Sequence, residues 1–383
     1  MTHAILSPSS ASRWLACTPS ARLEQQFPDT SGDAAKEGTV AHTLGELLLR
    51  EFLGLVSKPI FNRELFEIKQ SEYYSDAMHE YAEDYKAFVL ERFSEAKSRT
   101  SDAVLFLEHR LDMTEYVPEG FGTGDTVIVA DGTLDIIDLK YGKGVLVSAI
   151  ENKQMMLYAL GALKDFSFLY DIHTVRMTIY QPRLDNFSTF EMSVSELYKW
   201  AESELKEKAQ LAFEGKGEQV PGKHCGFCKV KPRCKALADY NLELAKHDFA
   251  APLLLEDSAI SVILSKLDLL TDWAGAIKKH ALDQALQGKK WEGFKLVEGR
   301  SVRKFTNEDE AAKTLIKAGW PEDSIYNKKI VGIGAIEKLI GKKGVEEKLG
   351  KFIEKPAGAP TLVPSTDKRP EFNSAISDFQ SIS

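Results

Sequence analysis

The chain has few cysteines and lacks long apolar runs. Four cysteines in 383 residues exclude a disulfide-rich secreted scaffold. No segment reaches the roughly 18 consecutive apolar residues that a transmembrane helix needs, so no membrane partner is expected. The first residues, MTHAILSPSSASRWLA, have neither the basic start nor the apolar stretch of a signal peptide. These absences predict a cytoplasmic protein whose thiols stay reduced and can bind metal.

An excess of positive charge is also missing. Lys and Arg number 49 against 57 Asp and Glu, a net charge of −8, so the chain as a whole does not attract nucleic acid. Binding needs only a local basic surface, and one runs through residues 276–304. Two interpretations of this segment stay open, a surface that follows a phosphate backbone and an ordinary solvated face. Its candidate DNA-binding residues are Lys278, Lys279, Lys289, Lys290, Arg300, Arg303 and Lys304.

The cysteines that are present have an unusual spacing. Cys17 lies near the N-terminus, whereas Cys225, Cys228 and Cys234 lie together in HCGFCKVKPRC. Four thiolates complete the ligand set of either an iron–sulfur cluster or a zinc ion. One early cysteine with a distant trio is more typical of a 4Fe–4S cluster, and the basic residues around the trio would stabilise its negative charge. Zinc remains the alternative cofactor. The simplest alternative is that the four thiols are unrelated and form no metal site.

Hydrophobic periodicity predicts a mixed α+β fold. Helices are expected over the first sixty residues and over residues 71–97, followed by an alternating strand over residues 103–113. The dipeptide Asp131-Gly132 between two β-branched runs predicts a hairpin. A helix, a strand and another helix follow, so the core order is α-β-β-β-α-β, a mixed central sheet flanked by helices. Three regions are expected: 1–100 helical, 101–245 the core with the cysteine trio, and 246–383 a helical and basic region with an extended tail.

The C-terminal region gives weaker signals. Residues 246–288 have a helical pattern, and residues 288–305 resemble a short basic β segment. The last residues are rich in Pro, Ser and charged side chains, which favours an extended tail.

The expected hairpin carries residues suited to metal-dependent chemistry. Asp138 and Lys140 are two positions apart, so on a strand their side chains share one face, and Asp125 on the partner strand can lie beside them. Carboxylate oxygens are the ligands that Mg²⁺ or Mn²⁺ prefers. A lysine beside such an ion can orient a water for attack on a phosphate. The turn and the opposite strand face account for Asp131 and Asp135.

These residues and their order resemble the PD-(D/E)xK nuclease superfamily, specifically its RecB-type branch. The similarity runs through LEHRL, GTGD, IIDLKYG and NKQMMLYAL. The positions that match the motifs of that branch are Glu108, Asp125, Asp138, Lys140, Gln154 and Tyr158, with His42 on an upstream helix. Some members, including the AddB nuclease subunit and the CRISPR-adaptation nucleases, also have one cysteine before the core and three after it. The chain further resembles an uncharacterised phage and prophage family.

The resemblance implies a role for each residue. It implies that His42, Asp125, Asp138 and the Leu139 carbonyl hold one or two Mg²⁺ or Mn²⁺ ions. Lys140 would position the attacking water, Glu108 would support the metal, and the cluster would close the domain. Gln154 and Tyr158 would hold the site or the DNA strand.

The function expected from this resemblance is that of a metal-dependent DNA exonuclease. It would process double-stranded ends in phage recombination or replication. A G-x-x-x-x-G-K-S/T loop is absent from the sequence, so unwinding would need a helicase partner, and a single-strand-binding or annealing protein is a further candidate partner. The alternative is a catalytically idle nucleic-acid-binding or assembly module that keeps the fold and the cluster.

Overall fold

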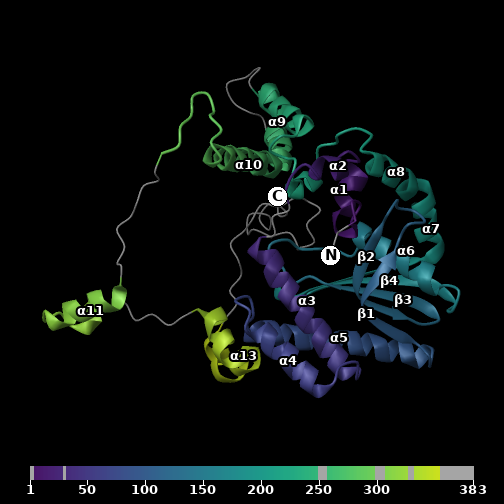
Figure 1. The fold of residues 1–383 in the computed structure, drawn as a ribbon, viewed down its shortest axis with the longest axis horizontal. Helices are drawn as coiled ribbons and strands as arrows, with labels where there is room; N and C mark the ends of the chain where they lie inside the picture. The colour runs from purple at the N-terminus through teal and green to yellow at the C-terminus, as the bar shows by residue number, and fades with distance from the viewer. Residues whose placement is uncertain (1–3, 29–31, 249–256, 298–306, 327–331, 354–383) are drawn as a thin grey trace, which may run out of the picture.

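The computed structural model describes residues 4–28, 32–248, 257–297, 307–326 and 332–353 (Figure 1). Its centre is one sheet of five strands in the order β1-β2-β3-β4-β5. The strands are β1 (Val104–Asp112), β2 (Phe121–Val129), β3 (Gly132–Leu139), β4 (Ile172–Gln181) and β5 (Asn186–Ser193). The pair β3–β4 is parallel and the other three pairs are antiparallel. The mixed sheet with flanking helices confirms the predicted fold class.

The hairpin at Asp131-Gly132 is confirmed. It joins β2 to β3, and Gly132 has a φ of 80°, a conformation that glycine adopts without steric cost. The parallel pairing of β3 with β4 needs a crossover. Helix α6 (Lys153–Phe166) supplies it, and the Asn152 side chain caps its start by accepting from the backbone N–H groups of Gln154 and Met155.

Alternation along β3 separates two hydrophobic cores. Leu134 and Ile136 pack in the core that includes α6, whereas Ile137 and Leu139 pack on the other face with Tyr85 of α5. The first core also holds the N-terminal helices and the helices after β5, whose bounds are α1 (Ala11–Ala16), α2 (Ser20–Glu24), α7 (Val194–Trp200), a π-helix (Ala201–Leu205) and α8 (Lys206–Glu214). The opposite face is covered by α3 (Asp33–Phe52), α4 (Lys58–Lys69) and α5 (Asp76–Arg99).

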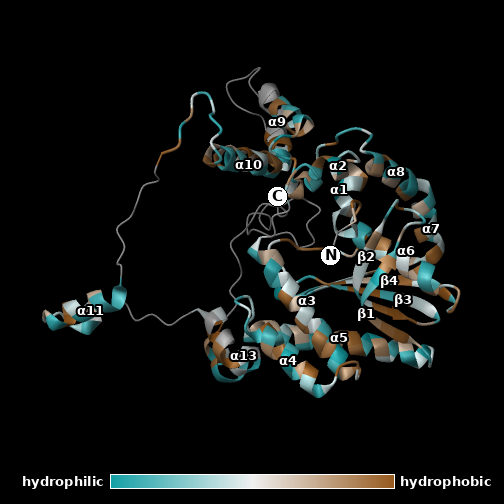
Figure 2. Cartoon of the chain, in the orientation of Figure 1, coloured by the Kyte–Doolittle hydropathy of each residue, from teal (hydrophilic) through white to brown (hydrophobic). Residues whose placement is uncertain are grey.

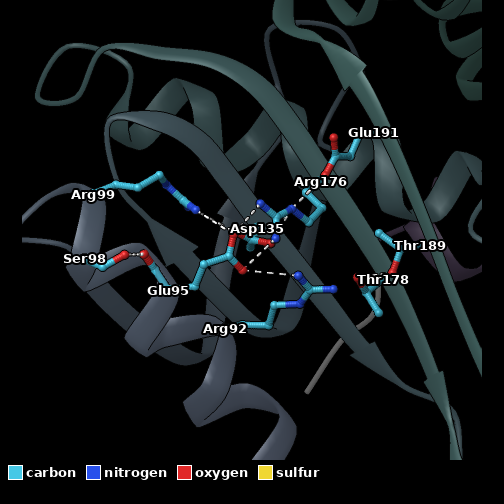
Figure 3. A network of polar contacts seen from close by, with 9 residues as sticks. All are labelled: Arg92, Glu95, Ser98, Arg99, Asp135, Arg176, Thr178, Thr189 and Glu191. Atoms are coloured by element: carbon cyan, nitrogen blue, oxygen red, sulfur yellow. Dashed lines mark hydrogen bonds and ion pairs between the residues drawn. The ribbon is translucent and has the colours of Figure 1, made fainter.

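A buried polar network lies on the α5 face of the sheet (Figure 3). Arg176 of β4 reaches Glu95 of α5 at 3.0 Å, Glu191 of β5 at 2.9 Å and Asp135 of β3 at 3.3 Å. Asp135 is 1% exposed. The network joins helix α5 to the strands β3, β4 and β5, and it faces away from Asp138, as the strand alternation requires.

Further helices lie at and after the cysteine trio. They are a short 3-10 helix (Lys223–Phe227), α9 (Lys235–Asp248), α10 (Asp257–Leu286), α11 (Glu308–Lys317), α12 (Glu322–Ile325), α13 (Ile333–Leu349) and a 3-10 turn (Gly350–Phe352). Helix α10 packs against α9 and the 3-10 helix at the trio, and α13 packs against α5. Figure 2 shows hydrophobic residues along the strands, while α10 carries both hydrophobic and hydrophilic residues. Every helix within the described ranges is too short or too polar to cross a membrane.

Two sequence expectations need correction. Strand β5 was not expected, although Asn186–Ser193 alternates in burial as an edge strand does. The basic β segment is wrong for residues 288–297, which form turns and irregular chain: Trp291 packs its indole back on α10 by donating to the Ala281 carbonyl at 2.9 Å. Residues 298–305 of that segment and most of the extended tail lie outside the described residues.

Candidate metal centres

The β2–β3 hairpin brings two aspartates to one end of the sheet. Thr126 pairs with Ile137, so the next positions along the two antiparallel strands are Asp125 and Asp138. The Leu139 backbone N–H donates to Oδ2 of Asp125 at 2.8 Å. The carboxylate of Asp125 is therefore fixed by the neighbouring strand, as the sequence predicted for these residues.

His42 and Glu108 converge on the same carboxylate. Nδ1 of His42 lies 3.3 Å from Oδ2 of Asp125. One ligand atom from each of His42, Glu108 and Asp125 lies within 4.8 Å of the other two. One nitrogen and two carboxylate ligands at this spacing suit a divalent cation such as Mn²⁺ or Mg²⁺.

Glu108 reaches this position through an unusual backbone. Its neighbours pair regularly, Leu107 with Thr126 and His109 with Gly124, so Glu108 lies opposite Asp125. Its φ is 45°, in the left-handed region that non-glycine residues rarely adopt inside a strand. Strain of this kind is concentrated at functional sites. The conformation places a carboxylate at the metal group at the expense of regular strand geometry.

Helix α3 carries His42 to the strand ends because Gly45 allows close packing. A Cβ at position 45 would lie 3.1 Å from the Tyr85 ring of α5 and 3.7 Å from the Leu139 side chain. Without a side chain there, α3 can approach both α5 and β3. The Tyr85 hydroxyl in turn lies 2.9 Å from the Thr126 hydroxyl on β2.

A second group of polar residues adjoins the first. The Lys140 ammonium lies 2.9 Å from Oδ2 of Asp138 and 3.2 Å from Oε1 of Gln154. Nε2 of Gln154 donates to Oδ1 of Asp138 at 3.0 Å and to the Tyr158 hydroxyl at 3.1 Å. The Asn152 cap at the start of α6 fixes Gln154 in this position. Lys140, Asp138, Gln154 and Tyr158 thus form one connected chain.

The electrostatics of the two groups differ. Burial would raise the pKa of Asp125, but the His42 imidazole beside it holds that pKa below its ordinary value. Burial raises the pKa of Asp138. Burial, together with the charge of Asp125, raises the pKa of Glu108 to about 7. Burial lowers the pKa of His42, yet the stronger combined effect of Asp125 and Asp138 brings it to about 9.

All the predicted site residues at the sheet lie together. The cavity next to Asp125 is lined by His42, Glu108 and Leu139, three of the expected metal ligands or supporting groups. The four cysteines and the basic residues lie elsewhere. Lys278 and Lys279 belong to α10, and Lys289 and Lys290 follow it, while Arg300, Arg303 and Lys304 lie outside the described residues.

Two features of the site were not predicted from the sequence. Glu46 lines the same cavity as His42. The available sequence signal was that Glu46 lies four residues after His42, a spacing that puts both side chains on one face of the helix. The other is the loop between Lys140 and Gln154. Gln181 of β4, 1% exposed, donates to the carbonyls of Gly142 and Val145, both at 2.8 Å, and accepts from the Val147 N–H at 3.1 Å.

The four cysteines line one cavity. Cys17 lies in it with Cys225, Cys228 and Cys234, and all four are free thiols. Backbone N–H groups donate toward three of the sulfurs. The N–H groups of Val220 and Ser20 face Cys17, and the N–H of Val230 faces Cys228. The Gly222 N–H lies 3.4 Å from the sulfur of Cys225. Amide donors of this kind stabilise thiolates in metal sites.

A buried ion pair holds the N-terminus at this cavity. Arg13 of α1 pairs with Glu24 at 2.8 Å, and the Lys229 backbone N–H donates to the second oxygen of Glu24 at 2.8 Å. Thr18 adds a hydrogen bond to the Lys216 carbonyl at 2.5 Å. Arg13 also lines the cavity, and burial raises the pKa of the Cys225 thiol there while the charge of Arg13 opposes this only in part. The predicted joining of Cys17 to the distant trio is therefore present.

The spacing of the sulfurs bears on which group they fit. Four sulfurs around one zinc would lie about 3.8 Å apart, because each Zn–S bond is about 2.3 Å. Among the described residues, the group of ligand atoms within 4.8 Å is that of His42, Glu108 and Asp125, and the cysteines form no group as close. The sulfurs are therefore spaced more widely here than around one zinc, and four thiols lining one cavity are also the ligand set of a polynuclear cluster.

The chain was compared with known proteins. It is similar to a solved structure entitled "Crystal structure of SSO0001", with 14% sequence identity over 57% of this chain and 95% of that chain, at a TM-score of 0.21. A family model described as "Protein of unknown function (DUF2800)" matches residues 3–370. This match spans nearly the whole sequence, and the chain therefore belongs to the DUF2800 family.

Proposed function

We propose that this protein is a Mg²⁺- or Mn²⁺-dependent deoxyribonuclease that degrades DNA from double-stranded ends. One observation carries the proposal. The ligand group of His42, Glu108 and Asp125 adjoins a half-buried lysine held between Asp138 and Gln154. A carboxylate-rich metal group beside a fixed ammonium is suited to hydrolysing a phosphodiester bond.

His42, Glu108 and Asp125, with Asp138 and the Leu139 carbonyl beside them, would hold the divalent ion. When bound, that ion would stabilise the negative charge that develops on the phosphate. The chain's own residues set the geometry. The Leu139 N–H and the His42 imidazole fix Asp125, and the strained backbone of Glu108 aims a second carboxylate at the same point.

Lys140 is placed to act on the attacking water. Burial lowers its pKa, but the Asp138 carboxylate at 2.9 Å more than offsets this, so its pKa lies above the ordinary value and it is a cation at neutral pH. An ammonium fixed by two oxygen atoms can hold a water oxygen in line with the phosphorus. Attack forms the new P–O bond as the water gives up a proton, the bond to the leaving deoxyribose oxygen breaks, and that oxygen takes up a proton.

The loop between Lys140 and Gln154 would contact the substrate. The Lys140–Gln154 hydrogen bond joins the two ends of the loop, so both ends of the loop lie at the site. It exposes Lys143 and the apolar side chains of Val145 and Leu146, which are 55% and 62% exposed. Gln181 holds the loop rigid. A cation with two apolar groups can bind a phosphate and pack against an unstacked base.

The cysteine site would be a structural 4Fe–4S cluster. It would join the N-terminal segment, which packs on the core that contains α6, to the chain after α8. Closure there would keep α6, and with it Gln154, in place.

The proposal is tested with anaerobically purified full chain and linear duplex DNA labelled at either end. Mn²⁺-dependent shortening of linear DNA, with closed circular DNA left intact, is the expected result. Cleavage of circular DNA at the same rate would show that the protein is an endonuclease and not an exonuclease. Binding of DNA without cleavage in Mg²⁺ or Mn²⁺ would overturn the proposal in favour of an idle binding module.

A further inference from the structure

Glu46 lies one helical turn beyond His42 on α3. Residues four apart share a helix face, and both side chains line the cavity that Glu108 and Asp125 also line. Glu46 is therefore a third carboxylate at this cavity, contributed by the same helix as the imidazole.

The partners of Glu46 leave its carboxylate largely uncommitted. Its ion pair is with Arg50, whose Nη1 lies 3.7 Å from Oε1 of Glu46. The same nitrogen lies closer to Glu64, at 3.3 Å, and donates its hydrogen bond there. Among the described residues, Glu46 accepts no side-chain hydrogen bond. An ion-pair contact this long, shared with a better-placed acceptor, does not explain why a partly buried carboxylate faces the cavity.

The charge of the cavity favours a cation near Glu46. Glu46, Glu108 and Asp125 contribute three carboxylates around a single imidazole. Glu46 and Glu108 line one cavity and carry charges of the same sign, so the two glutamates repel each other. A divalent ion between carboxylates removes that repulsion.

We propose that Glu46 is an additional oxygen ligand, direct or through one water, of the divalent cation held by His42, Glu108 and Asp125. Mn²⁺ and Mg²⁺ favour six ligands, so His42, Glu108, Asp125 and Glu46 would fill at most four positions, and Asp138, the Leu139 carbonyl, water and a phosphate oxygen would share the rest. The inference rests on the proposed function, because both use the same cation. It adds a residue whose role is metal affinity rather than positioning of the water.

The competing explanation is that Glu46 only pairs with Arg50. The chain offers a matched control, because Glu64 pairs with the same arginine but does not line the cavity. Glu46→Gln and Glu64→Gln each remove one carboxylate from Arg50. Arg50→Gln removes the arginine from both.

The test measures Mn²⁺ affinity by titration calorimetry and by the electron paramagnetic resonance signal of free Mn²⁺, with the cluster-loaded full chain and no DNA. Glu46→Gln is expected to weaken Mn²⁺ binding at least tenfold, about the loss expected for removing a supporting ligand. Glu64→Gln and Arg50→Gln are expected to stay within about twofold of the parent. Glu46→Asp, which keeps a carboxylate, should recover part of the affinity.

The outcomes separate this inference from the proposed function. If Glu46→Gln and Glu64→Gln bind Mn²⁺ equally well, or Arg50→Gln weakens binding as much as Glu46→Gln, Glu46 is a structural partner and the inference is wrong. If the parent binds Mn²⁺ no better than Asp125→Asn, the metal site itself fails and the proposed function fails with it. Thermal unfolding of each variant identifies any loss that reflects misfolding, and Glu46→Asp then decides between the two explanations.

Discussion

Nδ1 of His42 lies 3.3 Å from Oδ2 of Asp125, which joins helix α3 to the β2–β3 hairpin. The contact forms only when α3 is packed against the sheet, because the two residues are far apart in sequence and no local structure brings them together. The proposed metal group is therefore a product of tertiary packing, and its integrity can be tested separately from the stability of the hairpin.

The backbone of Glu108 makes a prediction about stability. In a regular strand, glycine is less favourable than alanine by about 0.5–1 kcal/mol. At Glu108, with a φ of 45°, the order should reverse, because alanine keeps the steric cost and glycine removes it. Glu108→Gly should be more stable to urea than Glu108→Ala by about 1 kcal/mol.

Arg110, two residues along the same strand, is the matched control. It is exposed and its φ is not positive, so Arg110→Gly should be less stable than Arg110→Ala. If both positions prefer alanine, Glu108 is not strained in solution and the strain argument for its role is wrong.

The cysteine cavity predicts a coloured protein. Anaerobically purified chain should contain iron and sulfide and absorb broadly near roughly 400 nm, and Cys17→Ala should lose most of that absorbance. Cys234→Ala should behave alike, because both thiols line the same cavity. Ser20→Ala, which changes another cavity residue without removing a sulfur, should keep the colour. A colourless protein with one zinc per chain would show that the four cysteines bind zinc and not a cluster.

The buried network on the other face of the sheet predicts a pH dependence. Burial raises the pKa of Asp135 to about 6, and Arg176 only partly opposes this. Because the folded pKa exceeds the unfolded value of about 3.9, the folded state holds more protons and loses stability as pH rises from about 4 to about 6. The loss attributable to this group is about 3 kcal/mol at most.

Asp135→Asn isolates that contribution. Its free energy of unfolding relative to the parent should rise with pH over the range from 4 to 7, then level off. Glu95 has the opposite sign: its hydrogen bonds with Arg176 lower its pKa to about 2, so its contribution is lost as pH falls below about 4.5. Parallel curves for Asp135→Asn and the parent would show that Asp135 is charged throughout.

Local sequence rules predicted the part of the site that depends on local geometry. Asp131-Gly132 determines the hairpin, and the hairpin alone places Asp138 near Asp125. The spacing of Gln154 and Tyr158 on one helix determines that both face the same way, and they are hydrogen-bonded. The resemblance then supplied His42, which no local pattern could place.

What could not be predicted depends on packing. The positive φ of Glu108 has no local sequence signal, since glutamate does not favour that conformation. In the sequence, Glu46 resembles an ordinary exposed helix residue. It lines the cavity only when α3 packs against the sheet. Strand β5 carried an alternating pattern that was overlooked. The basic residues 288–297 were expected to form a strand, but the Trp291 indole instead binds the Ala281 carbonyl on α10.

The central claim is that the group around Asp125 and Lys140 cleaves phosphodiester bonds. The most direct measurement is single-turnover degradation of an end-labelled linear duplex in Mn²⁺ by the parent, by Lys140→Ala and by Lys164→Ala. Lys164 lies on the same helix α6 as Gln154 but pairs with Asp112, outside the site. The account predicts that Lys140→Ala slows cleavage at least a hundredfold with DNA binding retained, while Lys164→Ala matches the parent. Equal rates for the parent and Lys140→Ala would contradict it.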